Sequence, residues 1–254
     1  MRYGVCCGLD LAPLVAEVGF DFVELSVGSF LKPREDEAAF QEVLREVRAL
    51  SIPWEASNGF LPGDLKLTGP DADPAAQREY VTTACRRAGE AGVRTIVFGS
   101  GAARCIPEGF GRDAAHEQLV SFLRMLGPIA QEHGVVIAIE PLNGKECNVL
   151  TSVGEAAAFA TEAGHPAIRV LVDAYHWMTD DNSAEDIVDN GSLIVHTHIA
   201  TKSRKVPGAE ECDFAPFFDA LKRGGYDGRV STEAGMADPP TELPRALEVL
   251  RSFG

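Results

Sequence analysis

The stretch VVIAIEPLNGKEC, residues 135–147, decides how the rest of the chain is interpreted. It begins with a short run of β-branched and small apolar residues that ends at Glu140 and is followed at once by Pro141. So short and apolar a run predicts a strand buried on both faces, as strands are in parallel sheets. Glu140 is therefore expected at the carboxyl end of a strand, which is where α/β proteins bind their ligands.

The same alternation of strand and helix extends to both sides of this stretch. Short apolar runs predict further strands at residues 3–7, 21–25, 52–56, 94–98, 168–172, 193–198 and 229–233. Amphipathic runs predict helices at residues 11–18, 35–50, 75–91, 114–133, 152–163, 183–189, 213–223 and 241–253. Gly19 and Gly92 fall between a helix and the next strand, where a left-handed glycine commonly ends the helix.

Eight strands, each followed by a helix, predict an α/β fold with one closed parallel sheet, a single (β/α)8 TIM barrel over residues 1–254. No Gly/Ser-rich or Pro-rich linker indicates a second domain. The alternative is an open, doubly wound sheet. Against it, the first strand–turn–helix lacks the GxGxxG pattern, and polar residues end strands throughout instead of at one switch point.

The composition excludes several classes of partner. The chain has 23 Lys and Arg against 38 Asp and Glu, a formal net charge of -15, which disfavours binding to nucleic acid. No apolar run approaches the roughly 20 residues of a membrane span, and the first residues lack the apolar core of a signal peptide, so we expect no membrane partner and a cytoplasmic protein. The six cysteines lack CxxC spacing, which predicts reduced thiols.

The later four strands all end in a potential metal ligand. Because the carboxyl ends of barrel strands converge, these side chains are expected to form one group. Carboxylate oxygens with one imidazole nitrogen suit one divalent metal ion, with Mn²⁺, Co²⁺ or Zn²⁺ favoured over Mg²⁺, which prefers more water. Any one of these residues alone could equally be a helix cap or the partner of a barrel arginine. The four residues are Glu140, Asp173, His198 and Glu233.

The histidines divide by position. His196 and His198 lie two residues apart, so their side chains point to the same face of a strand. We assign the outermost, His198, as the ligand, and expect His196 to lie behind it. His116, His133 and His165 lie on or beside predicted helices and are expected at the surface.

A few residues outside the ligand set could shape a pocket. Trp54, Asn58, Phe60 and Trp177 could wall a ligand pocket, although aromatic residues near strand ends are as often part of the core. Arg104, in the loop after the fourth strand, could meet a phosphate or carboxylate, but a solvated loop arginine is the expectation.

Four segments together carry a family resemblance. EPLNGKEC (140–147), DAYHW (173–177), HTHIATKSRKVPG (196–208) and STEA (231–234) resemble the xylose isomerase-like TIM-barrel superfamily of sugar phosphate isomerases and epimerases. Within it, the pattern is most similar to that of the D-tagatose/D-psicose 3-epimerases. The resemblance covers the C-terminal half well, and the first 100 residues match only in general shape.

The resemblance implies roles for seven residues. The family's metal ligands match Glu140, Asp173, His198 and Glu233, and its substrate-contacting positions match Glu146, His176 and Arg204. For Glu146 and Arg204 the alternative is a surface ion pair in a loop. In hydroxypyruvate isomerases the position of His198 looks to be glutamine, so a histidine leans toward the epimerases.

The implied activity is a metal-dependent sugar isomerase or epimerase. A divalent ion bound to a carbonyl and the neighbouring hydroxyl oxygen would acidify the C–H between them and stabilise an enediolate. Glu140 and Glu233 would act as the acid/base pair, one removing the proton and the other returning it. The substrate would be a small, carbohydrate-like molecule, phosphorylated or not, and the chain a monomer or a homo-oligomer.

Other readings stay open at this stage. A dehydratase of the inosose or dehydroshikimate type needs the same metal and base, and a hydroxypyruvate isomerase shares the superfamily. A DNA-repair endonuclease of this fold uses histidines from early strands, whereas this chain has none before His116. A non-catalytic sugar-binding barrel would not need the complete ligand set.

Overall fold

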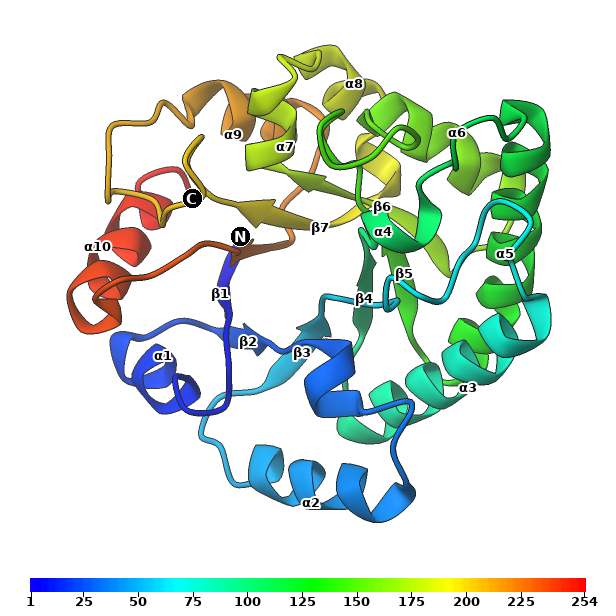
Figure 1. Ribbon diagram of the computed structural model, residues 1–254. Coiled ribbons are helices and arrows are strands. Elements are labelled where there is room, and N and C mark those ends of the chain that lie inside the picture. The colour runs from blue at the N-terminus through cyan, green and yellow to red at the C-terminus, as the bar shows by residue number, and fades with distance from the viewer.

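Eight parallel strands close into a barrel in sequence order in the computed structural model, which describes residues 1–254 (Figure 1). The strands are β1 (Arg2–Cys6), β2 (Phe22–Glu24), β3 (Trp54–Ser57), β4 (Thr95–Phe98), β5 (Val136–Ile139), β6 (Ile168–Asp173), β7 (Ile194–Ile199) and β8 (Arg229–Thr232). The (β/α)8 TIM barrel predicted from the alternating pattern is thereby confirmed.

The outer helices surround the strands (Figure 1). They are α1 (Ala12–Val18), α2 (Glu37–Arg48), α3 (Pro74–Ala91), α5 (Arg112–Glu132), α6 (Val153–Ala163), α8 (Ala184–Asp189), α9 (Ala215–Arg223) and α10 (Pro239–Arg251). Local chemistry sets their ends. The side chain of Asp36 accepts a hydrogen bond from the N–H of Ala39 and so caps α2. Gly19 and Gly92 end α1 and α3 with φ of 94° and 87°, as predicted.

The differences from the predicted elements are small and have a common cause. Boundaries move by one or two residues, because side-chain periodicity fades at element ends. Besides a 3₁₀ turn (Gly191–Leu193) just before β7, three short elements were not predicted: a π-helical turn (Val27–Leu31), α4 (Gly101–Arg104) and α7 (Ala174–Thr179). Each is too short to show a helical repeat in the sequence. All three follow strands β2, β4 and β6, at the carboxyl end of the barrel.

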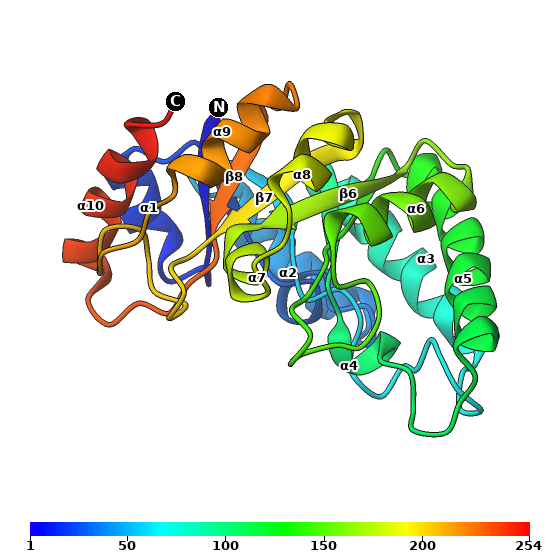
Figure 2. The same cartoon turned by 90° about the horizontal axis from the view of Figure 1, so that it is seen from above.

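The site-bearing end of the barrel can be located in Figure 2. The short helices α4 and α7 lie on the opposite side of the molecule from the two chain ends. Below this end, Val97, Ala138 and Leu171 form a small apolar cluster of their own. Because side chains alternate along a strand, Glu140 and Asp173 lie on the same face as Ala138 and Leu171, one layer higher. On strands β4 to β6 the barrel interior is therefore apolar at this level and polar one layer higher.

Two further expectations concern the whole chain. All six cysteines are free, in agreement with the prediction of reduced thiols. No helix combines the length and the apolar character required to cross a membrane.

Candidate metal centre

The four predicted ligands come from the four consecutive strands β5 to β8. In the strand register Asp173 is paired with His198, and His198 with Ser231, so the ligands of β6 and β7 stand side by side. Glu140 and Glu233 directly follow β5 and β8, and their N–H groups donate to Phe98 O and Ile199 O on the neighbouring strands, both at 3.1 Å. The backbone ladder thus fixes where all four side chains begin.

These side chains converge. One potential ligand atom from each of the four residues lies within 4.8 Å of the others. His198 Nδ1 is 3.0 Å from Glu140 Oε1 and 3.6 Å from Glu233 Oε2. Glu140, Asp173 and His198 are buried, and the side chain of Glu233 is 24% exposed. Substrate could therefore reach the group from the side of Glu233.

Space for Glu140 is left by a glycine at the end of β4. A methyl group on Gly99 would collide with Glu140 Oε2. Gly99 thus allows the carboxylate to lie against the neighbouring backbone.

The electrostatics of the group favour a bound cation. Burial, together with the charges of Glu140 and Glu233, raises the pKa of Asp173 to about 8. Burial also raises the pKa of Glu140 above its ordinary value. Burial opposes ionisation of Glu233 too, but His198 outweighs it and lowers the pKa of Glu233 to about 2. Like charges held this close repel, and a divalent ion between them would remove that repulsion. The donor set and its spacing therefore fit one divalent metal ion.

Of the three predicted substrate-binding residues, two lie beside this group. His176 is on α7, buried, with Nε2 at 3.6 Å from Asp173 Oδ2 and 2.9 Å from a guanidinium nitrogen of Arg204. Arg204 lies in the loop after β7, with its guanidinium 4.3 Å from the centre of the Tyr175 ring. Glu146 is exposed in the loop after β5 and reaches the others only through Asn143, whose Nδ2 donates to Glu146 Oε1 at 2.9 Å.

The protonation of His176 follows from its surroundings. Burial and the charge of Arg204 lower the pKa of His176 to about 3, so the ring is neutral at pH 7. The backbone N–H of Asn143 donates to Nδ1 at 3.0 Å, which places the ring proton on Nε2. His176 Nε2 and Arg204 are therefore both N–H donors, and the nearest acceptor for the two is Asp173 Oδ2, at 3.6 and 4.0 Å.

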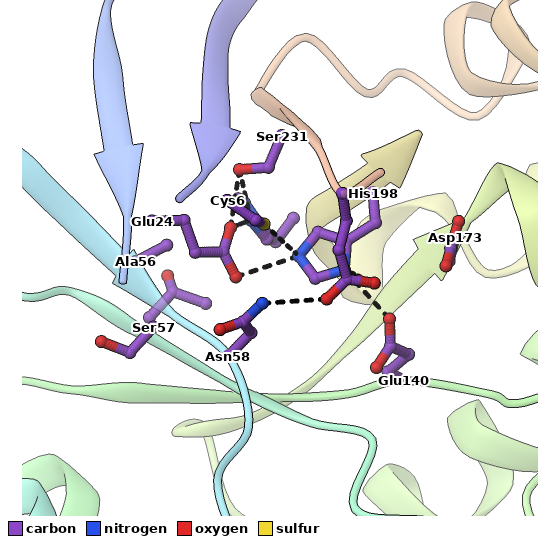
Figure 3. A network of polar contacts seen from close by, with 12 residues as sticks. Cys6, Glu24, Ala56, Ser57, Asn58, Glu140, Asp173, His198 and Ser231 are labelled. Atoms are coloured by element: carbon purple, nitrogen blue, oxygen red, sulfur yellow. Dashed lines mark hydrogen bonds and ion pairs between the residues drawn. The ribbon is translucent and has the colours of Figure 1, made fainter. Parts of the chain in front are cut away.

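The other nitrogen of His198 faces a second carboxylate, which the sequence did not identify as part of the site. Glu24, on β2, lies with Oε1 at 3.0 Å from His198 Nε2, and Figure 3 shows His198 between Glu24 and Glu140. His196 Nε2 is 2.8 Å from Glu24 Oε2, so it lies behind the ligand as expected. Cys6, on β1, has its sulfur 4.0 Å from His198 Nε2. The sequence carried one signal for the role of Glu24: it is a charged residue inside a predicted strand, residues 21–25, with apolar neighbours on both sides.

A cavity of about 370 Å³ opens next to Glu233. It is lined by residues from β1, the loops after β2, β3 and β7, and the end of β8, among them Cys7, Ser26, Asn58 and Arg204. Asn58 Nδ2 donates to Glu233 Oε1 at 2.9 Å (Figure 3), so Asn58 belongs to this pocket. The volume suits a small molecule.

The aromatic residues that the sequence suggested as walls of the pocket do not line this cavity. Trp54 and Phe60 are part of the core, and Trp177 packs against Phe217. The expectation of a solvated Arg104 is wrong. Its side chain is fully buried and donates to Phe98 O, Glu140 O and Leu150 O at 2.8–3.1 Å. The sequence showed an arginine in a loop, but α4 turns that loop inward against the ends of β4 and β5.

Comparisons with known proteins identify the family and the fold. Residues 12–253 match the model of the family described as xylose isomerase-like TIM barrel. The chain is 30% identical over 135 residues to a 3-dehydro-D-guloside 4-epimerase of Escherichia coli (strain K12), an alignment that covers 52% of this chain and 52% of the relative. It is 32% identical over 126 residues to a ketose 3-epimerase of Arthrobacter globiformis, covering 49% and 44%. The chain therefore spans about half the length of these curated relatives.

A solved structure extends the comparison to the whole fold. The crystal structure of a D-psicose 3-epimerase in the presence of D-fructose superposes with a TM-score of 0.86, covering 100% of this chain and 99% of the other. The two sequences are 19% identical, so this likeness shows a shared fold.

Proposed function

Since the chain belongs to the family of xylose isomerase-like TIM barrels, we propose that it is a sugar isomerase or epimerase that depends on one divalent metal ion. One observation carries the proposal: donor atoms of Glu140, Asp173, His198 and Glu233 gather within 4.8 Å at the carboxyl end of the barrel. The two glutamates come from β5 and β8, on either side of the two other ligands.

The four residues would hold the ion. Three carboxylates and an imidazole favour Mn²⁺, Co²⁺ or Zn²⁺ over Mg²⁺. When bound, the ion would draw electron density from the oxygens of a hydroxy ketone and make the intervening C–H more acidic.

Glu140 and Glu233 would move the proton. One carboxylate oxygen accepts it from one face of the sugar carbon, and the other glutamate returns a proton from the opposite side. Return to the same carbon inverts its configuration, whereas return to the neighbouring carbon moves the carbonyl. The hydrogen bond from Asn58 Nδ2 to Glu233 Oε1 orients that carboxylate for the transfer.

His176 and Arg204 would hold the sugar. Both present N–H donors beside Asp173, and a single substrate oxygen between them would accept from both. Glu146, tied to His176 through Asn143, would accept from a hydroxyl at the mouth of the site. This arrangement favours a polyhydroxy carbonyl compound as substrate.

The test is proton exchange in D2O, followed by NMR over a panel of ketoses, inososes and hydroxypyruvate, with Mn²⁺ or Co²⁺ added. The wild type is expected to introduce deuterium next to the carbonyl of at least one substrate. Glu140→Gln and Glu233→Gln should each slow exchange about 10²–10⁴-fold, because each removes a proton-transfer group. Glu162→Gln, an exposed glutamate on α6, is the control and should exchange as the wild type does. Wild-type exchange in either active-site variant would end the two-carboxylate proposal.

Product analysis separates the alternative activities. An epimerase yields an epimer with the carbonyl unmoved, and an isomerase yields a carbonyl at the neighbouring carbon. A dehydratase yields an enone or enol that absorbs ultraviolet light. A chain that binds the metal ion and sugars without any exchange would be a binding protein.

A further inference from the structure

Burying the carboxylate of Glu24 at its position in the barrel carries a high free-energy cost. Its side chain is fully buried on β2, and ionised carboxylates lose several kcal/mol on leaving water unless they are well paired. An apolar side chain of similar size would normally fill such a site with equal or greater stability. The presence of a carboxylate here therefore calls for a reason other than packing.

Three donors surround this carboxylate. His198 Nε2 lies 3.0 Å from Oε1, while His196 Nε2 and the hydroxyl of Ser231 lie 2.8 and 2.6 Å from Oε2. The donors come from β7 and β8, so Glu24 reaches across the barrel interior from β2. Because an ionised carboxylate only accepts hydrogen bonds, each facing nitrogen must carry its proton on that side.

This requirement fixes the orientation of His198. With Nε2–H committed to Glu24, Nδ1 faces Glu140 and Glu233, 3.0 and 3.6 Å away, and would offer its lone pair to a divalent ion that replaces the proton shared with these carboxylates. If the ring were flipped, or carried its only proton on Nδ1, it could neither donate to Glu24 nor present a lone pair to an ion between Glu140 and Glu233. Figure 3 shows the ring between the two sets of carboxylates.

We propose that Glu24 is the positioning residue of the metal centre, which holds His198 in the one tautomer and orientation that present Nδ1 to a divalent ion. The inference rests on the proposed metal-binding role of His198. A carboxylate behind a metal-binding imidazole both orients the ring and makes its free nitrogen a stronger donor to the ion. Strand β2 thus takes part in a site whose proposed ligands all come from the last four strands.

Direct binding of the ion by Glu24 is the competing explanation. Cys6, Glu24 and His198 also bring potential ligand atoms within 4.8 Å of one another. A cation there would use Nε2 of His198 and would need the Cys6 thiolate. A cation there would also break the hydrogen bond between His198 Nε2 and Glu24 Oε1. The two positions of the ion predict different spectra.

The test measures binding of the metal alone. Metal-free wild type and Glu24→Gln are titrated with Mn²⁺ and Co²⁺ by calorimetry, and we expect about 10–100-fold weaker binding in the variant. With Zn²⁺ bound, ¹⁵N NMR of labelled histidines should show His198 protonated on Nε2 in the wild type and a changed or exchanging signal in the variant. Glu55→Gln is the matched control. Glu55 lies on β3 and pairs with Arg2 at the other end of the barrel, so this variant should bind the metal ion with wild-type affinity.

The outcomes are distinct. Wild-type affinity and an unchanged His198 signal in Glu24→Gln would overturn the inference, as would a thiolate-to-cobalt charge-transfer band in the wild type, since the ion would then sit on Cys6. If Glu24→Gln does not fold, Glu24→Asp keeps the charge but withdraws it by one methylene, and full affinity in that variant would also overturn the inference. A wild type that binds no divalent ion at all would remove the proposed function itself.

Discussion

Asn58 shows how much of this site depends on single contacts between residues far apart in the chain. Its Nδ2 donates to Glu233 Oε1 at 2.9 Å, across 175 positions of sequence. The contact leaves Glu233 Oε2 facing His198. Because Glu233 is proposed to exchange a proton with the substrate, the orientation of its carboxylate matters more for the rate than for substrate binding.

Asn58→Ala is therefore expected to lower kcat about 10–100-fold, since it removes one hydrogen bond that orients a reacting group, and to change KM little. The hydrogen bond also contributes to the low pKa of Glu233, so its loss raises that pKa. The acid limb of the rate profile should then move to higher pH, because Glu233 must be ionised to accept a proton. Asn190→Ala, at the end of α8, is the control. An unshifted acid limb with wild-type kcat would show that Asn58 does not act on Glu233.

At the scale of elements, the ends of β4 and β5 depend on Arg104. The guanidinium donates to the carbonyls of Phe98, Glu140 and Leu150, and it lies 5.6 Å from the centre of the Phe98 ring. An apolar side chain of similar length at this position would leave the three carbonyls without these donors. Arg104 thus supports the backbone that carries Glu140.

We expect Arg104→Met to lower the free energy of unfolding by roughly 4 kcal/mol, because three carbonyls lose charge-assisted hydrogen bonds. Urea denaturation of the metal-free chain measures this. Arg78→Met, an exposed arginine on α3, should change stability by less than about 0.5 kcal/mol. Equal effects of the two substitutions would mean that Arg104 is no more than a surface residue in solution.

The element pattern explains what the sequence could and could not predict. The sequence could predict that Glu140, Asp173, His198 and Glu233 lie close together, because each closes a strand and parallel strands must bring their carboxyl ends together. Glu24, Asn58 and Arg104 could not be placed in this way. Their partners lie across the barrel or in a neighbouring loop, and such contacts depend on barrel curvature and on short turns that leave no periodic signal.

At the scale of the whole molecule, the barrel buries several carboxylates close together, and their burial and mutual repulsion oppose ionisation. The pKa of Asp173 is raised to about 8 by burial and by Glu140 and Glu233, against an ordinary value of 3.8. The folded chain therefore keeps a proton on Asp173 that the unfolded chain has already released above about pH 4. Between these values the unfolded state binds fewer protons, so the stability of the metal-free chain must fall as pH rises.

Asp173→Asn removes this titration and so isolates it. Relative to the variant, the metal-free wild type should lose up to about 1.4 kcal/mol of stability per pH unit between pH 4 and pH 8, and the loss should level off above pH 8. Mn²⁺ should restore the wild type at pH 8, because the ion favours the ionised carboxylate, and should stabilise Asp173→Asn less. Urea midpoints of both chains, with chelator or with Mn²⁺, measure all four cases. Parallel pH curves for the two metal-free chains would contradict the buried charge at Asp173. Divergent metal-free curves with equal stabilisation by Mn²⁺ would place the ion elsewhere, since a cation held by Asp173 must bind the wild type more tightly.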